Sequence, residues 1–238
     1  MAFKNFKLDT DADGIVLVTW DTPGRSMNVL DETSVTELEE IVKQTSADAA
    51  VKGVVITSGK EALCAGADLS MLEGMSRQYA ELLKSKGDEA ANQMLFDQSR
   101  RFSQVFRNIE TSGKPWAAAI NGLALGGGFE LTLSCHYRVA AENPKTRLGL
   151  PEIKVGLFPG AGGTQRVPRI VSPQDAMQLL LKGEAINLAK AKALNLIHAI
   201  VPAADLITAA KDWIEHFVGL GRNLSVKVDE PVELPKAS

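Results

Sequence analysis

Short apolar runs alternate with helical patterns along this chain, and the alternation limits the folds that it can adopt. Residues 15–19 and residues 54–57 are rich in β-branched side chains, which is typical of strands. The second run is short and continuous, as in a strand that is buried on both faces. Between the runs, Asp31 is a candidate helix N-cap, and apolar residues such as Leu38 and Ile41 follow it at helical spacing. This strand–helix–strand order predicts an α/β fold with a parallel sheet.

The middle of the chain repeats the same order. Residues 116–120 are expected to form a strand, residues 126–135 a helix and residues 137–140 a further extended segment. Ahead of them, residues 75–109 carry apolar residues at helical spacing, with an interruption at Gly87. We therefore expect two helical stretches before the second strand–helix–strand block.

The last third of the chain is predicted to be helical. Ser172 is a candidate N-cap with a proline at the first helical position, and Gly183 is a candidate helix stop. Residues 206–217 place large apolar side chains at helical spacing, which predicts a helix with one face on the core. We expect one compact domain over residues 1–218, followed by an irregular tail or linker remnant over residues 219–238.

The composition excludes several classes of protein. Hydrophobic residues make up 45% and charged residues 23% of the chain, which is ordinary for a globular domain and excludes intrinsic disorder. The net charge is −3, because there are 26 basic and 29 acidic residues. This balance argues against nucleic acid as a partner.

Neither the cysteines nor the N-terminus indicates an oxidising compartment. Cys64 and Cys135 show neither a metal-ligand spacing nor a disulfide framework, so a reducing compartment is expected. Residues 1–7 lack the apolar run of a signal peptide. No stretch approaches the roughly 18 apolar residues that a spanning helix needs. We therefore expect a cytoplasmic protein without a membrane span.

Two glycine-containing segments superficially suggest nucleotide binding. In residues 53–60 the glycines are one residue too far apart for a phosphate-binding loop, and the residues between them form a predicted strand. In residues 159–165, Gln165 occupies the position of the third glycine of a dinucleotide fingerprint. Neither segment therefore supports a nucleotide or NAD cofactor.

A third glycine-rich segment lies between a predicted strand and a predicted helix. Gly126, Gly127 and Gly128 would let the backbone approach a ligand closely and would leave N–H groups at a helix N-terminus. Such N–H groups can bind an oxygen atom that becomes negatively charged. Glu130 follows in the first helical turn, where it could cap the helix or take part in acid–base chemistry. From this segment alone, tight helix–strand packing and catalysis remain equal alternatives.

Two further segments carry acidic residues in comparable settings. Residues 63–69 follow a predicted strand and contain Asp68, a natural helix cap, so a plain connecting loop is the simpler interpretation. N–H groups from this loop and from the triple-glycine segment could nevertheless converge on one carbonyl oxygen, as in an oxyanion hole. Glu152 lies among apolar residues, where a lone carboxylate is costly unless it is paired or functional. A salt bridge at the edge of the core is the alternative explanation for Glu152.

Three of these segments together resemble the crotonase (enoyl-CoA hydratase) superfamily. They are residues 64–69, 119–130 and 151–166, and with the order of elements the resemblance covers roughly residues 5–217. Within the superfamily, the chain is most similar to the N-terminal hydratase region of multifunctional fatty-acid-oxidation α subunits. The resemblance implies an α/β fold of the crotonase type, a superhelix of repeated strand–strand–helix units with a helical C-terminal part.

The resemblance also implies candidate site residues. The two oxyanion-hole N–H groups of the family correspond to Ala67 and Gly127, and its two catalytic acids correspond to Glu130 and Glu152. Three further positions match family residues around the substrate, namely Ala65 and Leu69 at the adenine end of the coenzyme A site and Gly160 beside the catalytic water.

The activity implied by the resemblance is hydration of a trans-2-enoyl-CoA thioester in fatty acid β-oxidation, because both acids are present. The alternatives are a Δ3,Δ2-enoyl-CoA isomerase activity, instead or in addition, and a catalytically inactive acyl-CoA-binding fragment. Coenzyme A would be part of the substrate, and neither a separate cofactor nor a metal ion is expected. The family further implies a homotrimer, or association with dehydrogenase and thiolase components.

Overall fold

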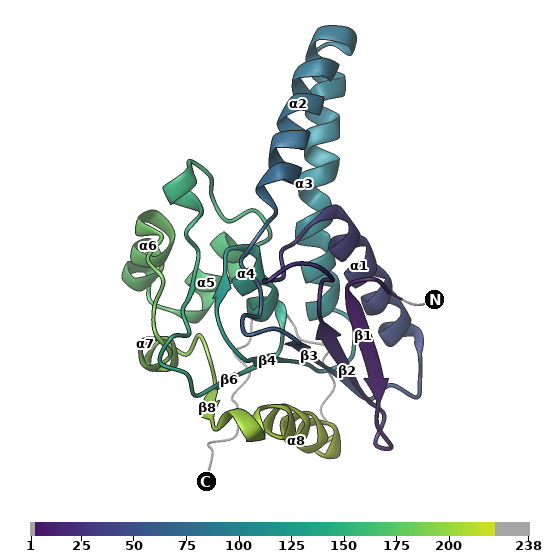
Figure 1. Ribbon diagram of the computed structural model, residues 1–238, viewed down its shortest axis with the longest axis vertical. Helices are drawn as coiled ribbons and strands as arrows, with labels where there is room; N and C mark the ends of the chain where they lie inside the picture. The colour runs from purple at the N-terminus through teal and green to yellow at the C-terminus, as the bar shows by residue number, and fades with distance from the viewer. Residues whose placement is uncertain (1–2, 222–238) are drawn as a thin grey trace.

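A mixed sheet lies at the centre of the computed structural model, which describes residues 3–221 (Figure 1). Its strands, in spatial order, are β1 (Phe6–Thr10), β2 (Ile15–Trp20), β3 (Gly53–Ser58), β4 (Trp116–Ile120), β6 (Tyr137–Ala141) and β8 (Ala199–Val201). β1 is antiparallel to β2, whereas every later pair in this order is parallel. The predicted parallel α/β sheet is confirmed, and an antiparallel edge strand is added to it.

Each face of the sheet has its own apolar core, because successive side chains of a strand point to opposite faces. Val54 of β3 belongs to the larger cluster, which includes helices α1 (Glu32–Ala47) and α3 (Asp88–Glu110). The next residue, Val55, belongs to the smaller cluster under helix α8 (Leu206–Gly219). All six residues of β3 are buried, since helices cover both faces.

The caps predicted for two helices are present. Asp31 accepts a hydrogen bond from the Ser34 N–H, and the Ser34 hydroxyl accepts one from the Asp31 N–H, so α1 begins with a capping box. Helix α6 (Pro173–Lys182) has Ser172 as its N-cap. Gly183 ends this helix with φ +60°, a left-handed conformation that glycine adopts without strain.

Helix α2 (Leu69–Lys86) and the first half of α3 form a helical hairpin that projects from the rest of the molecule (Figure 1). Gly87 with φ +83° makes the turn, at the predicted interruption. No residue of α2 is buried, and Tyr79 donates its hydroxyl hydrogen to Asn92 of α3. α2 therefore packs against α3 rather than against the core of the domain.

The remaining elements connect the sheet to the helices. They are β5 (Ala124–Leu125), α4 (Gly127–Ser134), β7 (Leu148–Gly149), the 3-10 helix η1 (Glu152–Val155), α5 (Gly163–Ile170), α7 (Leu188–Ala193) and the 3-10 helix η2 (Ala203–Asp205). α8 ends at Gly219, and most of the predicted tail, residues 219–238, lies outside the described residues. None of the helices within residues 3–221 has the length and apolar character to cross a membrane.

Candidate active site

The N-terminus of α4 is built from closely packed glycines. An added Cβ would come within 2.5 Å of Leu30 Cδ1 at Gly127 and within 2.6 Å of the Cys64 Cβ at Gly128. Gly126 precedes the helix with φ +52°. The glycine run therefore does allow tight packing, which was one of its two interpretations. This packing brings the start of α4 against residues 64–67.

The loop after β3 lies directly beside this helix start. The Leu125 N–H donates to the Cys64 carbonyl at 3.0 Å. A Cβ on Gly126 would be 3.6 Å from the Gly66 Cα, so the two backbones almost touch. Asp68 ends the loop as the N-cap of α2, accepting from the Ser70 N–H. The two segments predicted to supply backbone donors are therefore neighbours in space.

Two backbone N–H groups at this junction have no acceptor within residues 3–221. In the loop, the Ala65 N–H donates to the Asn28 carbonyl and the Asp68 N–H to the Leu30 carbonyl, but the Ala67 N–H has no such partner. The Gly127 N–H is the first of α4 and cannot bond within its own helix. Both of the predicted oxyanion-hole donors are thus free to bind an oxygen atom of a ligand.

Glu130, in the first turn of α4, is 2% exposed. Its Oε1 accepts hydrogen bonds from the N–H groups of Ala161 at 2.9 Å and Gly163 at 2.7 Å. Burial, the largest cause, and the negative charge of Glu152 raise the pKa of Glu130, whereas the two N–H donors and the Arg166 guanidinium lower it, and the net result is a pKa of about 7. The carboxyl group is therefore held rigidly and titrates near neutral pH.

Glu152 is held less tightly, at the start of η1 on the other side of the α4 N-terminus. Its Oε1 lies 3.2 Å from the Cβ position of Gly126, and its Oε2 is buried without a hydrogen-bond partner among the described residues. Burial raises the pKa of Glu152. The alternative of a salt bridge is not supported, because no basic side chain within residues 3–221 forms an ion pair with Glu152.

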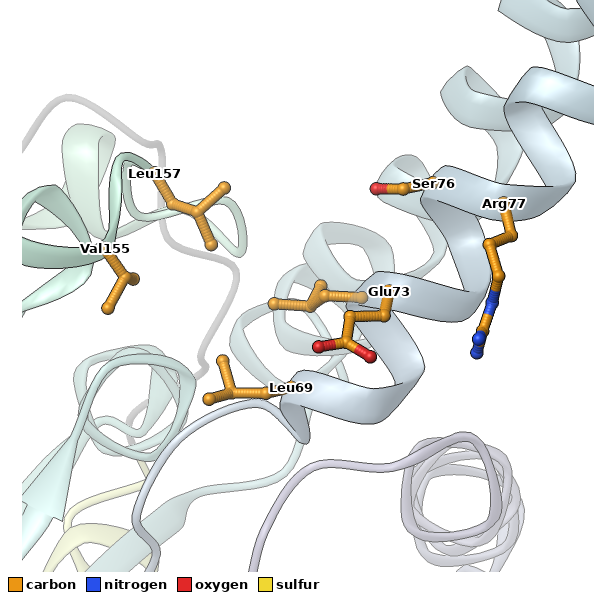
Figure 2. A pocket seen from close by; sticks show the side chains of 7 residues that line it. Leu69, Glu73, Ser76, Arg77, Val155 and Leu157 are labelled. Carbon is orange, nitrogen blue, oxygen red and sulfur yellow. The ribbon is translucent and has the colours of Figure 1, made fainter.

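A groove of about 450 Å³ lies between α2 and the segment that follows Glu152 (Figure 2). Its lining residues come from the first turns of α2 and from the segment after Glu152, and they are Leu69, Leu72, Glu73, Ser76, Arg77, Val155 and Leu157. In Figure 2, Leu69 points across the groove toward Val155. The resemblance assigned Leu69 to the adenine end of a coenzyme A site, which stays a prediction, and the sequence analysis did not name the other lining residues. The exposed apolar residues after Glu152 are a signal for a binding surface.

The other predicted positions flank the site. Ala65 is half-buried in the loop beside Ala67. Gly160 is exposed, has open space where a Cβ would stand, and directly precedes Ala161, whose N–H binds Glu130. Both positions are therefore close to groups of the site. Ala65 is two residues before Ala67 in the chain, and Gly160 is next to the turn that holds Glu130.

The histidines near the core accept hydrogen bonds from backbone N–H groups, and the two cysteines pack in the core. The Nδ1 of His136 accepts from the Trp116 N–H at 3.1 Å, and burial lowers the pKa of His136 to about 4. The His198 Nδ1 accepts from the Arg138 N–H in the same way. Burial raises the pKa of Cys64 and of Cys135 to about 12, so neither thiol is an activated nucleophile. Within residues 3–221, no three His, Cys, Asp or Glu side chains gather to hold a metal ion.

Comparisons with known proteins identify the family. A family model described as enoyl-CoA hydratase/isomerase matches residues 10–234. The fatty acid oxidation complex subunit alpha of Idiomarina loihiensis is 40% identical over 215 residues, which are 90% of this chain but 28% of that relative. The subunit of the same name from Shewanella frigidimarina is 40% identical over 208 residues, or 87% of this chain and 27% of the relative. The chain thus spans little more than a quarter of the length of these relatives.

Solved structures show the same architecture. An enoyl-CoA hydratase from Bacillus anthracis matches with a TM-score of 0.75 at 31% identity, covering 90% of this chain and 76% of that chain. DspI of Pseudomonas aeruginosa matches with a TM-score of 0.74 at 27% identity, covering 90% and 80%. The fold is therefore the mixed α/β crotonase fold with a C-terminal helix. The chain belongs to the enoyl-CoA hydratase/isomerase family, whose members bind acyl-CoA and are mostly enzymes.

Proposed function

We propose that this chain is an enoyl-CoA hydratase, a lyase that adds water to the 2,3 double bond of a trans-2-enoyl-CoA thioester. The observation that carries the proposal is the arrangement at the α4 N-terminus. There, two carboxyl groups with raised pKa values stand beside two backbone N–H groups that have no acceptor in the described part of the chain. The two carboxyl groups suit proton transfer, and the two N–H groups suit an oxygen atom that gains negative charge.

The N–H groups of Ala67 and Gly127 would bind the thioester carbonyl oxygen. When water attacks C3, the electrons of the double bond move toward this oxygen, which takes on enolate character. Donors that are already in place stabilise that charge, an effect of about 3 kcal/mol for one donor in a comparable case. The partial positive charge at the N-terminus of α4 acts in the same direction.

The two glutamates would share the proton transfers. Glu130, as a carboxylate, would take a proton from the water that attacks C3, and Glu152 would deliver the proton that C2 receives. A pKa near 7 suits a base that must be ionised yet must hold a proton in the transition state. The Ala161 and Gly163 N–H groups bind one oxygen of Glu130 and leave its Oε2 to face the Gly127 side of the site.

The groove between α2 and the segment that follows Glu152 would take the apolar part of the substrate. Its walls continue from the site itself, since Leu69 follows Ala67 by two residues and Val155 follows Glu152 by three. Leu72, Val155 and Leu157 offer the apolar surface that an acyl chain requires. Leu69, which the resemblance assigned to the adenine end of the coenzyme A site, lines the same groove and is assigned to the acyl chain in this proposal instead.

A second candidate activity is Δ3,Δ2-enoyl-CoA isomerisation, which moves a proton between two carbon atoms of the bound enolate. The buried Oε2 of Glu152, which has no hydrogen-bond partner among the described residues, favours it as an addition to hydration. Glu152 could shuttle such a proton alone, without a water molecule on Glu130.

The setting of this activity is also part of the proposal. We place the reaction in fatty acid β-oxidation in the cytoplasm, which is consistent with the sequence. The reaction would need neither a metal ion nor a cofactor other than the coenzyme A of the substrate. The relatives named as α subunits of a fatty acid oxidation complex support association with other components of such a complex. The family resemblance implies that these components are a dehydrogenase and a thiolase, and a homotrimer is the alternative assembly. Mass measurement in solution distinguishes the two assemblies.

The decisive assay follows the ultraviolet absorbance of the conjugated enoyl thioester, with crotonyl-CoA and a long-chain 2-enoyl-CoA in parallel. Loss of the absorbance with formation of the 3-hydroxy product supports the hydratase. Appearance of the absorbance from a 3-enoyl-CoA demonstrates isomerisation. Tight binding of crotonyl-CoA without either reaction would instead identify an inactive acyl-CoA-binding module.

A further inference from the structure

Arg166 of α5 is a buried arginine whose side chain makes three hydrogen bonds to two separate parts of the fold. Its side chain is only 10% exposed. Nε donates to Glu110 Oε1 at 2.7 Å and Nη2 donates to Glu110 Oε2 at 3.0 Å, a bidentate pair that fixes the plane of the guanidinium. Glu110 is the last residue of α3, so this pair ties α5 to a helix of the main core.

The third contact of Arg166 lies on the turn that holds Glu130. Nη1 donates to the Ala161 carbonyl at 2.8 Å. The same turn, residues 161–163, points the N–H groups of Ala161 and Gly163 at Glu130 Oε1. Ala161 is therefore held by Arg166 through its carbonyl and by Glu130 through its N–H.

The intervening Gly162 shows how closely the guanidinium fits this turn. Gly162 has φ +107°, and a Cβ built there would overlap Nη1 of Arg166. The guanidinium therefore packs directly against the backbone of this turn, whereas Gly160 just before it has open space around its Cβ position. The contacts form a continuous chain from Glu110 through Arg166 and Ala161 to Glu130.

We propose that Arg166, anchored by Glu110, is a positioning residue that holds the 161–163 turn so that its two N–H groups fix the Glu130 carboxyl group for proton transfer. This inference rests on the proposed hydration, because the hydration mechanism is what requires Glu130 to be held in a fixed position. Arg166 itself does not need to touch the substrate.

The charges around Glu130 predict the direction in which its pKa changes when Arg166 is lost. Facing Glu130 are the Glu152 carboxylate from η1, which raises its pKa, and the Arg166 guanidinium from α5, which lowers it. Glu110 lies behind Arg166 and partly offsets its charge. Loss of Arg166 removes the positive charge and loosens the two N–H donors, and both changes raise the pKa of Glu130.

Arg166→Met is the direct test, because methionine keeps much of the buried volume and removes the charge and all three contacts. We expect kcat for crotonyl-CoA hydration to fall roughly 10- to 100-fold, as for a misplaced reacting group, with KM nearly unchanged. The acidic limb of the pH–rate profile should move to higher pH. Arg166→Lys keeps the charge but cannot bind both Glu110 oxygens and the Ala161 carbonyl at once. It should therefore restore the pH profile and only part of kcat.

Arg169→Met is the matched control, since Arg169 lies on the same helix but, among residues 3–221, forms hydrogen bonds only to Gln165 in the preceding turn. It should keep the wild-type kcat and pH profile. If Arg166→Met is poorly folded by circular dichroism, the Lys variant carries the kcat test. A folded Arg166→Met variant with wild-type kcat and an unshifted pH profile would overturn the positioning role.

A second measurement does not depend on turnover. The carboxyl carbon of Glu130 is followed by ¹³C NMR in the ligand-free protein, with its signal identified by its loss in Glu130→Gln. Arg166→Met should raise the midpoint of this titration, and an unchanged midpoint contradicts the proposal. If the wild-type protein does not hydrate crotonyl-CoA, the proposed function fails, while this titration still tests whether Arg166 controls Glu130.

Discussion

Glu130 and Glu152 flank the same helix start but are held by different contacts. Glu130 is fixed by two backbone donors, whereas Glu152 keeps one oxygen without a partner among the described residues. We expect Glu130→Gln and Glu152→Gln each to lower kcat for hydration by roughly 10²–10⁴, because each removes one proton-transfer group. Steady-state hydration of crotonyl-CoA measures this, and calorimetry with the same thioester should show little change in affinity. Near-wild-type turnover of either variant contradicts a mechanism with two carboxyl groups.

The glycine at position 127 has a packing requirement that can be tested separately from catalysis. An added Cβ there would stand 2.5 Å from Leu30 Cδ1, and Leu30 is fully buried. We expect Gly127→Ala to lower the free energy of unfolding by about 1–3 kcal/mol through overpacking. Leu30→Val removes the opposing atom, so the alanine should cost less in the double variant than alone. Urea unfolding of the four proteins checks this, and strictly additive costs would show that Leu30 is not the obstacle.

Among the secondary-structure elements, α2 and η1 contribute residues to the groove that we propose for the acyl chain. Val155 is 63% exposed and lines the groove opposite Leu69, so a larger side chain there can fill the groove without disturbing the core. We expect Val155→Trp to lower kcat/KM for a long-chain enoyl-CoA about tenfold, a change of ~1.4 kcal/mol, and to leave crotonyl-CoA almost unaffected. Leu181→Trp, at an exposed position of α6 that does not line the groove, is the control. Equal losses with both substrates would place the acyl chain elsewhere.

The elements that the sequence predicted well are those with strong local signals. Asp31 and Ser172 are capping residues followed by regular apolar spacing, and both helices begin at the expected positions. β1 was missed because only its first residue, Phe6, is buried, so no apolar alternation marks it. β8 was missed because it has only three residues. The groove was missed because its two walls come from separate helices that the chain pattern does not bring together.

At the scale of the whole molecule, the contacts that tune the site join residues far apart in the sequence. The resemblance to the crotonase superfamily provided Glu130, but its donors at positions 161 and 163 lie more than 30 residues away. Glu110 and Arg166 are separated by 56 residues. Local propensity carries no information on such pairs, because they arise only when α3, α4 and α5 pack together. The raised pKa of Glu130 therefore could not be predicted from the sequence alone.

Burial of Glu130 should also make the stability of the whole molecule depend on pH. The pKa of Glu130 is about 7 in the folded protein against an ordinary value of 4.5, so the folded state binds this proton more tightly than the unfolded chain. Its contribution to the free energy of unfolding is therefore fully present below pH 4.5 and is lost as the pH rises through 7. The difference between the two pKa values corresponds to about 3 kcal/mol.

Glu130→Gln removes this titration and leaves the rest of the chain unchanged. The free energy of unfolding of the wild-type protein should thus fall by about 3 kcal/mol relative to that of the variant between about pH 4 and pH 8. Urea unfolding of both proteins at a series of pH values measures the difference, in which the titrations of shared groups such as Asp68 largely cancel. A difference between the two proteins that stays constant over this range would mean that Glu130 is solvated or paired in the folded state, and that its burial does not raise its pKa.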